Sequence, residues 1–168
     1  VKAAVDAGAD VIISGAGLPV RLPEYVGDSD CKIAPIVSSE KAASLMLRNW
    51  DKKYGRTADF LVIEGPEAGG HLGFKEEQLK HITTKEYEDE IKKIIETVRG
   101  YEEKYGKKIP VIIAGGIFDH EDICHALSIG ADGVQIASRF VATDECDADE
   151  KYKQAYIDAK AEDVEIVM

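Results

Sequence analysis

Short apolar segments alternate with longer amphipathic segments along the whole chain. Each apolar segment is continuously hydrophobic, which is typical of parallel strands that are covered on both faces. A turn follows each of them, and a helical pattern usually comes next. The predicted strands are residues 10–14, 32–37, 59–64, 110–114 and 133–137. The pattern therefore predicts an α/β protein with a parallel sheet.

Most of the predicted helices begin at a capping residue and end at or near a glycine. They run from Ser38 or Ser39 to about Tyr54, from the Thr83/Glu86 capping box to Gly106, from Asp119 to Gly130, and over 149–162. Their buried stripes are expected to be Ala42, Met46 and Trp50, then Tyr87, Ile91, Ile94, Ile95, Val98 and Tyr105, and in the last helix Tyr152, Ala155, Tyr156 and Ala159. Residues 1–7 have the pattern of a helix end terminated by Gly8, and 74–86 form a polar, lid-like segment.

The β/α alternation is most similar to that of an eight-stranded barrel, but five strands cannot close one. We therefore expect a fragment of a barrel in which strand 10–14 or 133–137 lacks its neighbour. Such an open edge favours association with other chains, so a homo-oligomer is an open alternative. A complete, open doubly wound sheet is the other interpretation of the pattern.

Composition places the chain among soluble globular proteins, with 45% hydrophobic and 32% charged residues. The net charge of -11, without a basic cluster, argues against a nucleic-acid partner. Three cysteines outside any CxxC pattern favour reduced thiols, and no segment has the length of a membrane span or the pattern of a signal peptide. We expect a cytoplasmic protein with a small-molecule substrate and without a membrane partner.

His71 is the first candidate for chemistry. It lies in AGGHLG, directly after a buried strand, where small neighbours let a substrate reach the imidazole. The carboxyl ends of strands are the usual place of catalysis in α/β folds, and imidazole is the standard general base near neutral pH. A structural histidine beside a flexible loop is the alternative. Glu64, at the end of the same strand, is either a ligand contact or an anchor for the loop.

A second candidate site is a phosphate cradle. Gly115 and Gly116 follow strand 110–114, where backbone amides can approach a phosphate closely, although the two glycines also suit a plain tight turn. The loop after strand 133–137 would add the amides near Ala137 and Ser138 and the Ser138 hydroxyl. Arg139 either braces this loop or touches the ligand.

The segment HEDICH at 120–125 differs from the HExxH zinc motif. Cys124 stands at the second ligand position, and His125 falls on another face of the helix. We therefore expect no metal site there.

Three motifs together, EGPEAGGHLGF, PVIIAGGI and GADGVQIASRFVATDE, resemble the nitronate monooxygenase family, formerly called 2-nitropropane dioxygenases. This family shares its fold with the FMN-dependent enoyl-ACP reductases. SGAGLP at 14–19 and APIVSS at 34–39 are also similar to the family's middle strands. The resemblance implies that residues 8–145 form the fourth to eighth strands of a TIM-type (β/α)8 barrel, within a single partial FMN-binding domain over 1–168.

The resemblance further implies FMN at the barrel mouth, with His71 as the catalytic base that takes the α-proton of a nitroalkane. The residues it assigns to the cofactor are Gly70, Gly115, Gly116, Gln135, Ala137 and Ser138. The implied activity is oxidation of alkyl nitronates or nitroalkanes with molecular oxygen. An FMN-dependent enoyl-thioester reductase that uses NAD(P)H is the alternative, and a flavin-free phosphate-binding or inactive fragment is a further one. Ala137 and Ser138 stand where the family commonly has Gly-Thr.

Overall fold

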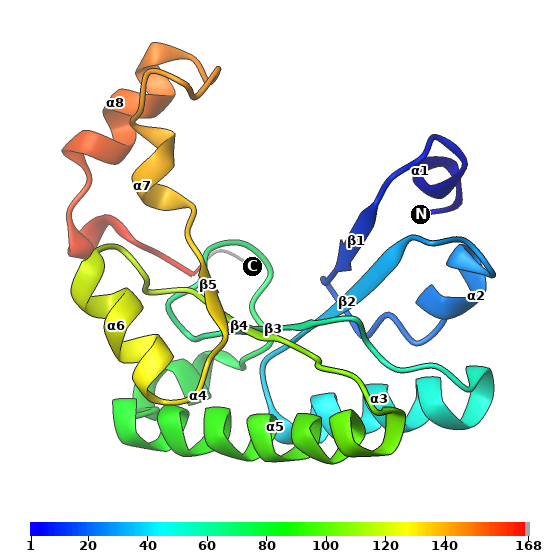
Figure 1. Cartoon of the computed structure of the whole chain (residues 1–168). Helices are drawn as coiled ribbons and strands as arrows, with labels where there is room; N and C mark the ends of the chain where they lie inside the picture. Colours follow the sequence, from blue (N-terminus) through cyan, green and yellow to red (C-terminus); the bar gives the residue numbers. More distant parts are fainter. Residues whose placement is uncertain (167–168) are drawn as a thin grey trace.

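The fold is an α/β arrangement of short strands and longer helices (Figure 1). A computed structural model describes residues 1–166. The strands are β1 (Val11–Ser14), β2 (Lys32–Val37), β3 (Leu61–Glu64), β4 (Val111–Ala114) and β5 (Gly133–Gln135). The helices are α1 (Lys2–Asp6), α2 (Leu22–Val26), α3 (Glu40–Tyr54), α4 (Glu76–His81), α5 (Thr84–Tyr105), α6 (His120–Ser128), α7 (Ser138–Val141) and α8 (Glu150–Asp158), with a 3-10 turn at Ala161–Asp163.

All five strands are parallel and lie side by side in chain order, β1-β2-β3-β4-β5. A doubly wound sheet reverses its strand order at a switch point, and this sheet has no reversal. Within residues 1–166, β1 pairs only with β2 and β5 only with β4, as expected for edge strands. Since parallel crossovers are right-handed, a consecutive order places the connecting helices on one face of the sheet.

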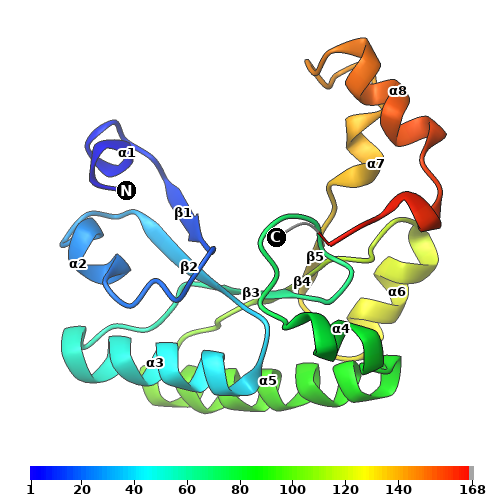
Figure 2. The ribbon, with the colours of Figure 1, turned by 180° about the vertical axis from the view of Figure 1, so that it is seen from behind.

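The helix-covered face of the sheet holds the core. Figures 1 and 2 show α3 and α5 side by side beneath the strands. Strand residues that alternate along the chain point into this layer and pack against the buried stripes of the two helices. The core includes Ile33, Val37, Leu61, Ile63, Val111 and Ile113 from the strands, and Met46, Trp50, Ile91, Ile94 and Val98 from α3 and α5.

Among residues 1–166, no helix layer covers the opposite face of the sheet. In Figure 2, α1 stands at the β1 end and α7 and α8 stand at the β5 end, all on the side away from α3 and α5. Val11 and Ile13 of β1 are 46% and 47% exposed. This face therefore leaves apolar strand positions open at the β1 edge.

Helix signals in the sequence are confirmed for the long helices. The Ser39 hydroxyl accepts a hydrogen bond from the Ala42 amide at 3.3 Å, and Gly55 ends α3 in the left-handed conformation. Thr83 and Glu86 form the expected capping box of α5. Asp119 caps α6.

Several predicted boundaries and one predicted stripe are wrong. The helix predicted over 149–162 is shorter, and the expected inward stripe is exposed, with Tyr152 at 52% and Tyr156 at 42%. The reason is that α8 packs mainly on α7 and stands apart from the layer of α3 and α5 (Figure 1). The last strand stops at Gln135 because α7 begins at Ser138, and the lid-like segment contains α4.

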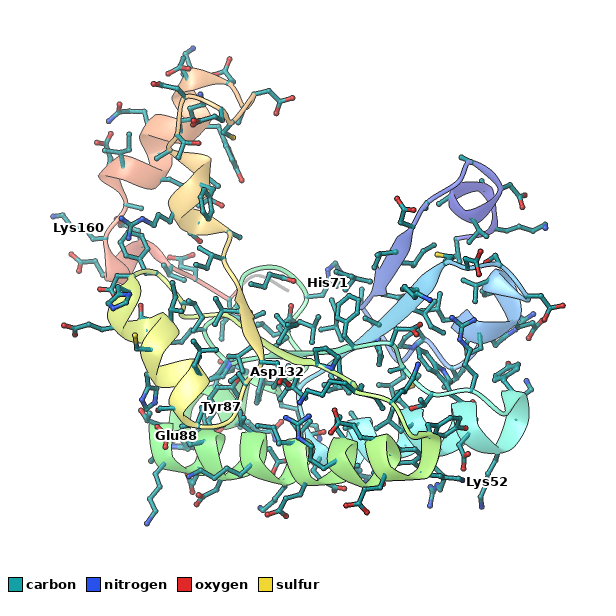
Figure 3. The ribbon with its side chains drawn as sticks, viewed as in Figure 1. Lys52, His71, Tyr87, Glu88, Asp132 and Lys160 are labelled. Carbon is teal, nitrogen blue, oxygen red and sulfur yellow. The ribbon has the colours of Figure 1, made fainter. Side chains whose placement is uncertain are left out.

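Carboxylates hold the amino-terminal ends of the strands. Asp59 accepts hydrogen bonds from the Ile33 amide at 2.9 Å and from Lys107 at 3.0 Å, and it also pairs with Arg56 at 3.2 Å. Asp132, labelled in Figure 3, makes a similar contact with the Val111 amide at 2.9 Å. Burial raises the pKa of the Asp59 carboxyl, but the Ile33 hydrogen bond and the two cations outweigh it, so the pKa lies below its ordinary value.

We predict that Asp59→Ala lowers the free energy of unfolding by about 1–3 kcal/mol at pH 7, because the Ile33 amide loses its charged acceptor. A carboxyl with a lowered folded pKa stabilises the protein above its unfolded pKa of about 3.9 and loses this effect as the pH falls through the folded value. The difference in the free energy of unfolding between wild type and variant should therefore become smaller in acid. Urea unfolding at pH 7 and at about pH 3 measures it. Asp144→Ala, an exposed position, is the control, and an equal difference at both pH values would contradict the prediction.

Candidate active site

His71 lies in the loop after β3, at the carboxyl edge of the sheet, and its side chain is exposed. Figure 3 shows it above the strands, on the side away from α5. This histidine lines two hollows in the surface. The expectation that His71 faces a cavity at the carboxyl edge is therefore confirmed, whereas its catalytic role stays a prediction.

One of the two hollows is lined partly by the ends of β2 and β3 and has a volume of about 390 Å³. We call it the His71 cleft. Its walls come from the loops after β1, β2 and β3. The lining residues are Gly15, Ala16, Gly17, Leu18, Ile36, Val37, Ser38, Ser39, Ala42, Glu64, His71, Leu72 and Gly73. The cleft is thus mostly apolar, with hydroxyl, imidazole and carboxyl groups as its polar parts.

Small residues let these loops approach one another. A side chain at Gly73 would collide with the Ser38 side chain, whose Cβ lies 2.7 Å from the position of the added Cβ. The loop after β1 carries Ala16 at φ 55° and Gly17 at φ 118°, and the indole N–H of Trp50 donates to the Pro19 carbonyl at 3.2 Å. This loop was not among the predicted site residues, although GAG directly after a strand was the available signal.

Glu64 ends β3 and lines the same cleft as His71. It follows Ile63, which lies in the core, so alternation along the strand places Glu64 on the face away from the core helices. Burial raises the pKa of the Glu64 carboxyl, and no charge or hydrogen bond from a described residue opposes that effect. Glu64 is therefore available to a bound molecule, whereas a role as a loop anchor has no contact to support it among residues 1–166.

Tyr87 supports the loop after β3 from below. The Tyr87 hydroxyl is buried and has no hydrogen-bond partner within residues 1–166, and a Cβ on Gly65 would lie 2.6 Å from it. The Phe74 ring meets the Tyr87 ring edge to face, with 6.5 Å between centroids. Burial, followed by the charges of Glu64 and Glu67, raises the pKa of the Tyr87 hydroxyl. The sequence pattern identified Tyr87 as a stripe residue and gave no signal for this unpaired hydroxyl.

The two glycines of the predicted cradle have φ of 91° and 72° and pack against the loop after β3. A Cβ on Gly115 would lie 2.8 Å from the Ala68 amide nitrogen, and one on Gly116 would collide with the Glu67 carboxylate. Both glycines line a second cavity, of about 250 Å³, between α5 and α6. Gly115 is therefore required by backbone packing, whereas at Gly116 the positive φ favours glycine and the flexible Glu67 side chain could move.

The loop after β5 carries the other predicted cofactor residues. Gln135 ends β5, Ala137 directly precedes α7 and Ser138 is its first residue, and all three are exposed. Arg139 donates to the Phe118 carbonyl at 2.9 Å and lies over the Phe118 ring. Arg139 therefore braces this loop against the loop after β4, while the alternative that it touches a ligand stays a prediction. The structure brings Gly70 together with His71, while Gly115 and Gly116 line the separate cavity.

The HEDICH segment forms no metal centre in the described part of the chain, where no cluster of three or more potential ligands occurs. The Cys124 sulfur lies 3.4 Å from His120 Nε2, and His125 Nε2 lies 2.9 Å from a Glu88 carboxylate oxygen. All three cysteines are free. Across residues 1–166, no helix has both the length and the apolar character that a membrane span requires.

A parallel sheet with helices on one face and polar groups at its carboxyl edge is the arrangement of barrel-type α/β enzymes. The sequence profile described as nitronate monooxygenase matches residues 1–168. The chain belongs to the nitronate monooxygenase family.

Curated relatives and solved structures agree with this assignment. A probable nitronate monooxygenase of Staphylococcus saprophyticus is 32% identical over 106 residues, which cover 62% of this chain and 27% of the relative. One of Bacillus subtilis is 32% identical over 111 residues, 66% of this chain and 29% of the relative. FabK from Thermotoga maritima has a TM-score of 0.71 at 30% identity, covering 94% of this chain and 42% of that one. The nitroalkane oxidase of Streptomyces ansochromogenes, with a TM-score of 0.65 at 23% identity, shows the fold alone and covers 91% and 40%. The chain therefore spans less than a third of these curated relatives and less than half of these solved chains.

Proposed function

We propose that the protein is an FMN-dependent oxidoreductase that oxidises alkyl nitronates or nitroalkanes with molecular oxygen, with His71 as its general base. The observation that carries the proposal is the place of His71 in a cleft at the carboxyl edge of the sheet, in a chain of the nitronate monooxygenase family. Neutral imidazole accepts a proton near physiological pH, and the cleft is open to a small molecule.

In the proposed reaction a nitroalkane binds in the His71 cleft with its α-carbon toward the imidazole. The α C–H bond breaks, the proton passes to an imidazole nitrogen, and the electron pair moves onto the nitro group to give the nitronate. FMN, when bound, would supply the redox chemistry that couples oxidation of the nitronate to reduction of oxygen.

The residues proposed to hold FMN fit a phosphate group. Gly115 and Gly116 have no side chains of their own to shield their amides, and the flexible Glu67 carboxylate beside Gly116 would have to turn away from a bound phosphate. Ala137 and Ser138 begin the neighbouring loop, which Arg139 braces against Phe118. Gln135 and Gly70 complete the proposed contacts.

We also propose that this chain supplies the fourth to eighth strands of a (β/α)8 barrel. Support comes from the consecutive strand order, the single-sided helix layer and the partial coverage of FabK. Barrel closure would pair β1 and β5 with further strands and cover Val11 and Ile13.

A second candidate function is that of an enoyl-thioester reductase that uses NAD(P)H, as implied by the family resemblance. The likeness to FabK at 30% identity is the observation that supports this candidate. Oxygen consumption with a nitroalkane or nitronate, compared with NAD(P)H oxidation in the presence of an enoyl thioester, separates the two. We expect oxygen consumption and a yellow protein. A colourless protein that is inactive in both assays would favour the flavin-free alternative.

A further inference from the structure

The loop that carries His71 follows β3, from Gly65 to Phe74, and has few hydrogen bonds. In the described part of the chain it takes part in two backbone hydrogen bonds, both at its start. The Gly65 amide donates to the Ala114 carbonyl at 2.8 Å, and the Ala68 amide donates to the Gly65 carbonyl at 3.2 Å. His71 lies beyond both of these bonds. The position of its imidazole therefore depends on how side chains pack against the loop.

Tyr87 of α5 contacts both ends of this loop. Its hydroxyl lies where a side chain on Gly65 would begin, 2.6 Å from the position of an added Cβ. Its ring meets the Phe74 ring edge to face, with 6.5 Å between centroids. Figure 3 shows Tyr87 on the helix side of the sheet and His71 on the other side, so Tyr87 acts on His71 only through the loop. One side chain therefore holds the loop where it begins and where it ends.

The hydroxyl makes Tyr87 an unfavourable residue for a contact that needs packing alone. It is buried and has no hydrogen-bond partner within residues 1–166. A buried polar group without a partner destabilises a protein, and phenylalanine would avoid this penalty. The ring also borders the cavity of about 250 Å³ between α5 and α6, so no close neighbour on that side would fill the space of a shorter side chain. An unpaired buried group calls for an explanation, and the reach of the hydroxyl to Gly65 supplies one.

We propose that Tyr87 is a positioning residue for the reaction, which holds Gly65 and Phe74 so that His71 between them stays at its cleft. The inference rests on the proposed function and deepens it, because the position of a general base decides how readily it takes the substrate proton. All of these contacts lie between the consecutive elements β3, α4 and α5 and the loop that joins them. They therefore do not depend on the strands that would complete a barrel.

The test compares Tyr87→Phe with Tyr105→Phe in the intact protein. Both tyrosines belong to α5, but the Tyr105 hydroxyl, at the carboxyl end of the helix, donates to Asp51 at 2.7 Å. Tyr87→Phe should raise the melting temperature by about 2–4 °C, because an unpaired hydroxyl is removed, whereas Tyr105→Phe should lower it by a similar amount. The kcat for 1-nitropropane should nevertheless fall about three- to tenfold in Tyr87→Phe, with KM unchanged within about twofold, and stay at the wild-type value in Tyr105→Phe. Tyr87→Leu, which also loses the Phe74 contact, should lower kcat at least about tenfold.

Hydrogen–deuterium exchange makes the test independent of turnover. The segment 65–74 should exchange at least about threefold faster in Tyr87→Phe, faster still in Tyr87→Leu, and at the wild-type rate in Tyr105→Phe. Unchanged exchange in both Tyr87 variants would overturn the inference, and so would faster exchange with an unchanged kcat, which would show a purely structural contact. A joint fall of kcat and melting temperature in Tyr87→Phe would overturn it as well. Lack of nitroalkane oxidation by the wild type would instead contradict the proposed function, and the exchange rates would still decide whether Tyr87 holds the loop.

Discussion

His71→Ala should lower nitroalkane turnover by about 10²- to 10⁴-fold, the usual contribution of a general base, while the flavin content of the purified protein stays unchanged. The reason is that the imidazole acts on the substrate proton, whereas the proposed cofactor contacts lie mainly in the loops after β4 and β5. Oxygen consumption measures the first quantity, and the visible absorbance of released flavin measures the second.

His81→Ala is the matched control, because His81 is an exposed histidine at the end of α4 and lines neither the His71 cleft nor the cavity beside Gly116. It should leave both quantities unchanged. Parallel loss of flavin and activity in His71→Ala would indicate a structural histidine, and full activity in that variant would place the base elsewhere.

Gly116→Val should lower flavin affinity at least about tenfold, because a branched side chain would cover the amide proposed to meet the phosphate. Gly116 has φ 72°, and the added Cβ would collide with the Glu67 carboxylate. The variant therefore also disturbs the contact between the loops after β3 and β4. Flavin retained after gel filtration, relative to protein, measures the loss.

The control variant Gly106→Val separates the effect of backbone strain from loss of the phosphate contact. Gly106 ends α5 with φ 61° in open space, so valine there introduces similar left-handed strain away from the site. Thermal unfolding should show destabilisation in both variants, with flavin loss in Gly116→Val alone. Equal flavin content in the two variants would show that other residues bind the phosphate.

Short-range sequence patterns correctly predicted the starts of the long helices and the positions of the strands. The capping residues Ser39, Thr83 and Asp119 mark true helix starts because each satisfies otherwise unpaired amides. The five apolar runs are true strands because their side chains reach a core between sheet and helices. Strand order was left open between a barrel and a doubly wound sheet, since hydrophobic periodicity does not encode which strands are neighbours.

The features that the sequence did not predict depend on contacts between distant parts of the chain. Tyr152 and Tyr156 are spaced for an inward stripe, but a stripe is buried only where another layer covers it, and the described chain places none on α8. In the site, His71 and the glycine pair were identifiable from strand ends and glycine content. The loop after β1, the Ser38 contact with Gly73 and the unpaired Tyr87 hydroxyl depend on segments brought together from distant parts of the chain.

The carboxylates at the amino ends of the strands have a consequence for how this scaffold can be altered. Asp59 and Asp132 bind backbone amides at one edge of the sheet, and the His71 cleft is built from loops at the other. Substitutions at sites that share no partners usually have additive effects. A protein engineer can therefore vary the loops around the cleft to change selectivity and reinforce the opposite edge separately, with little epistasis between the two sets of changes.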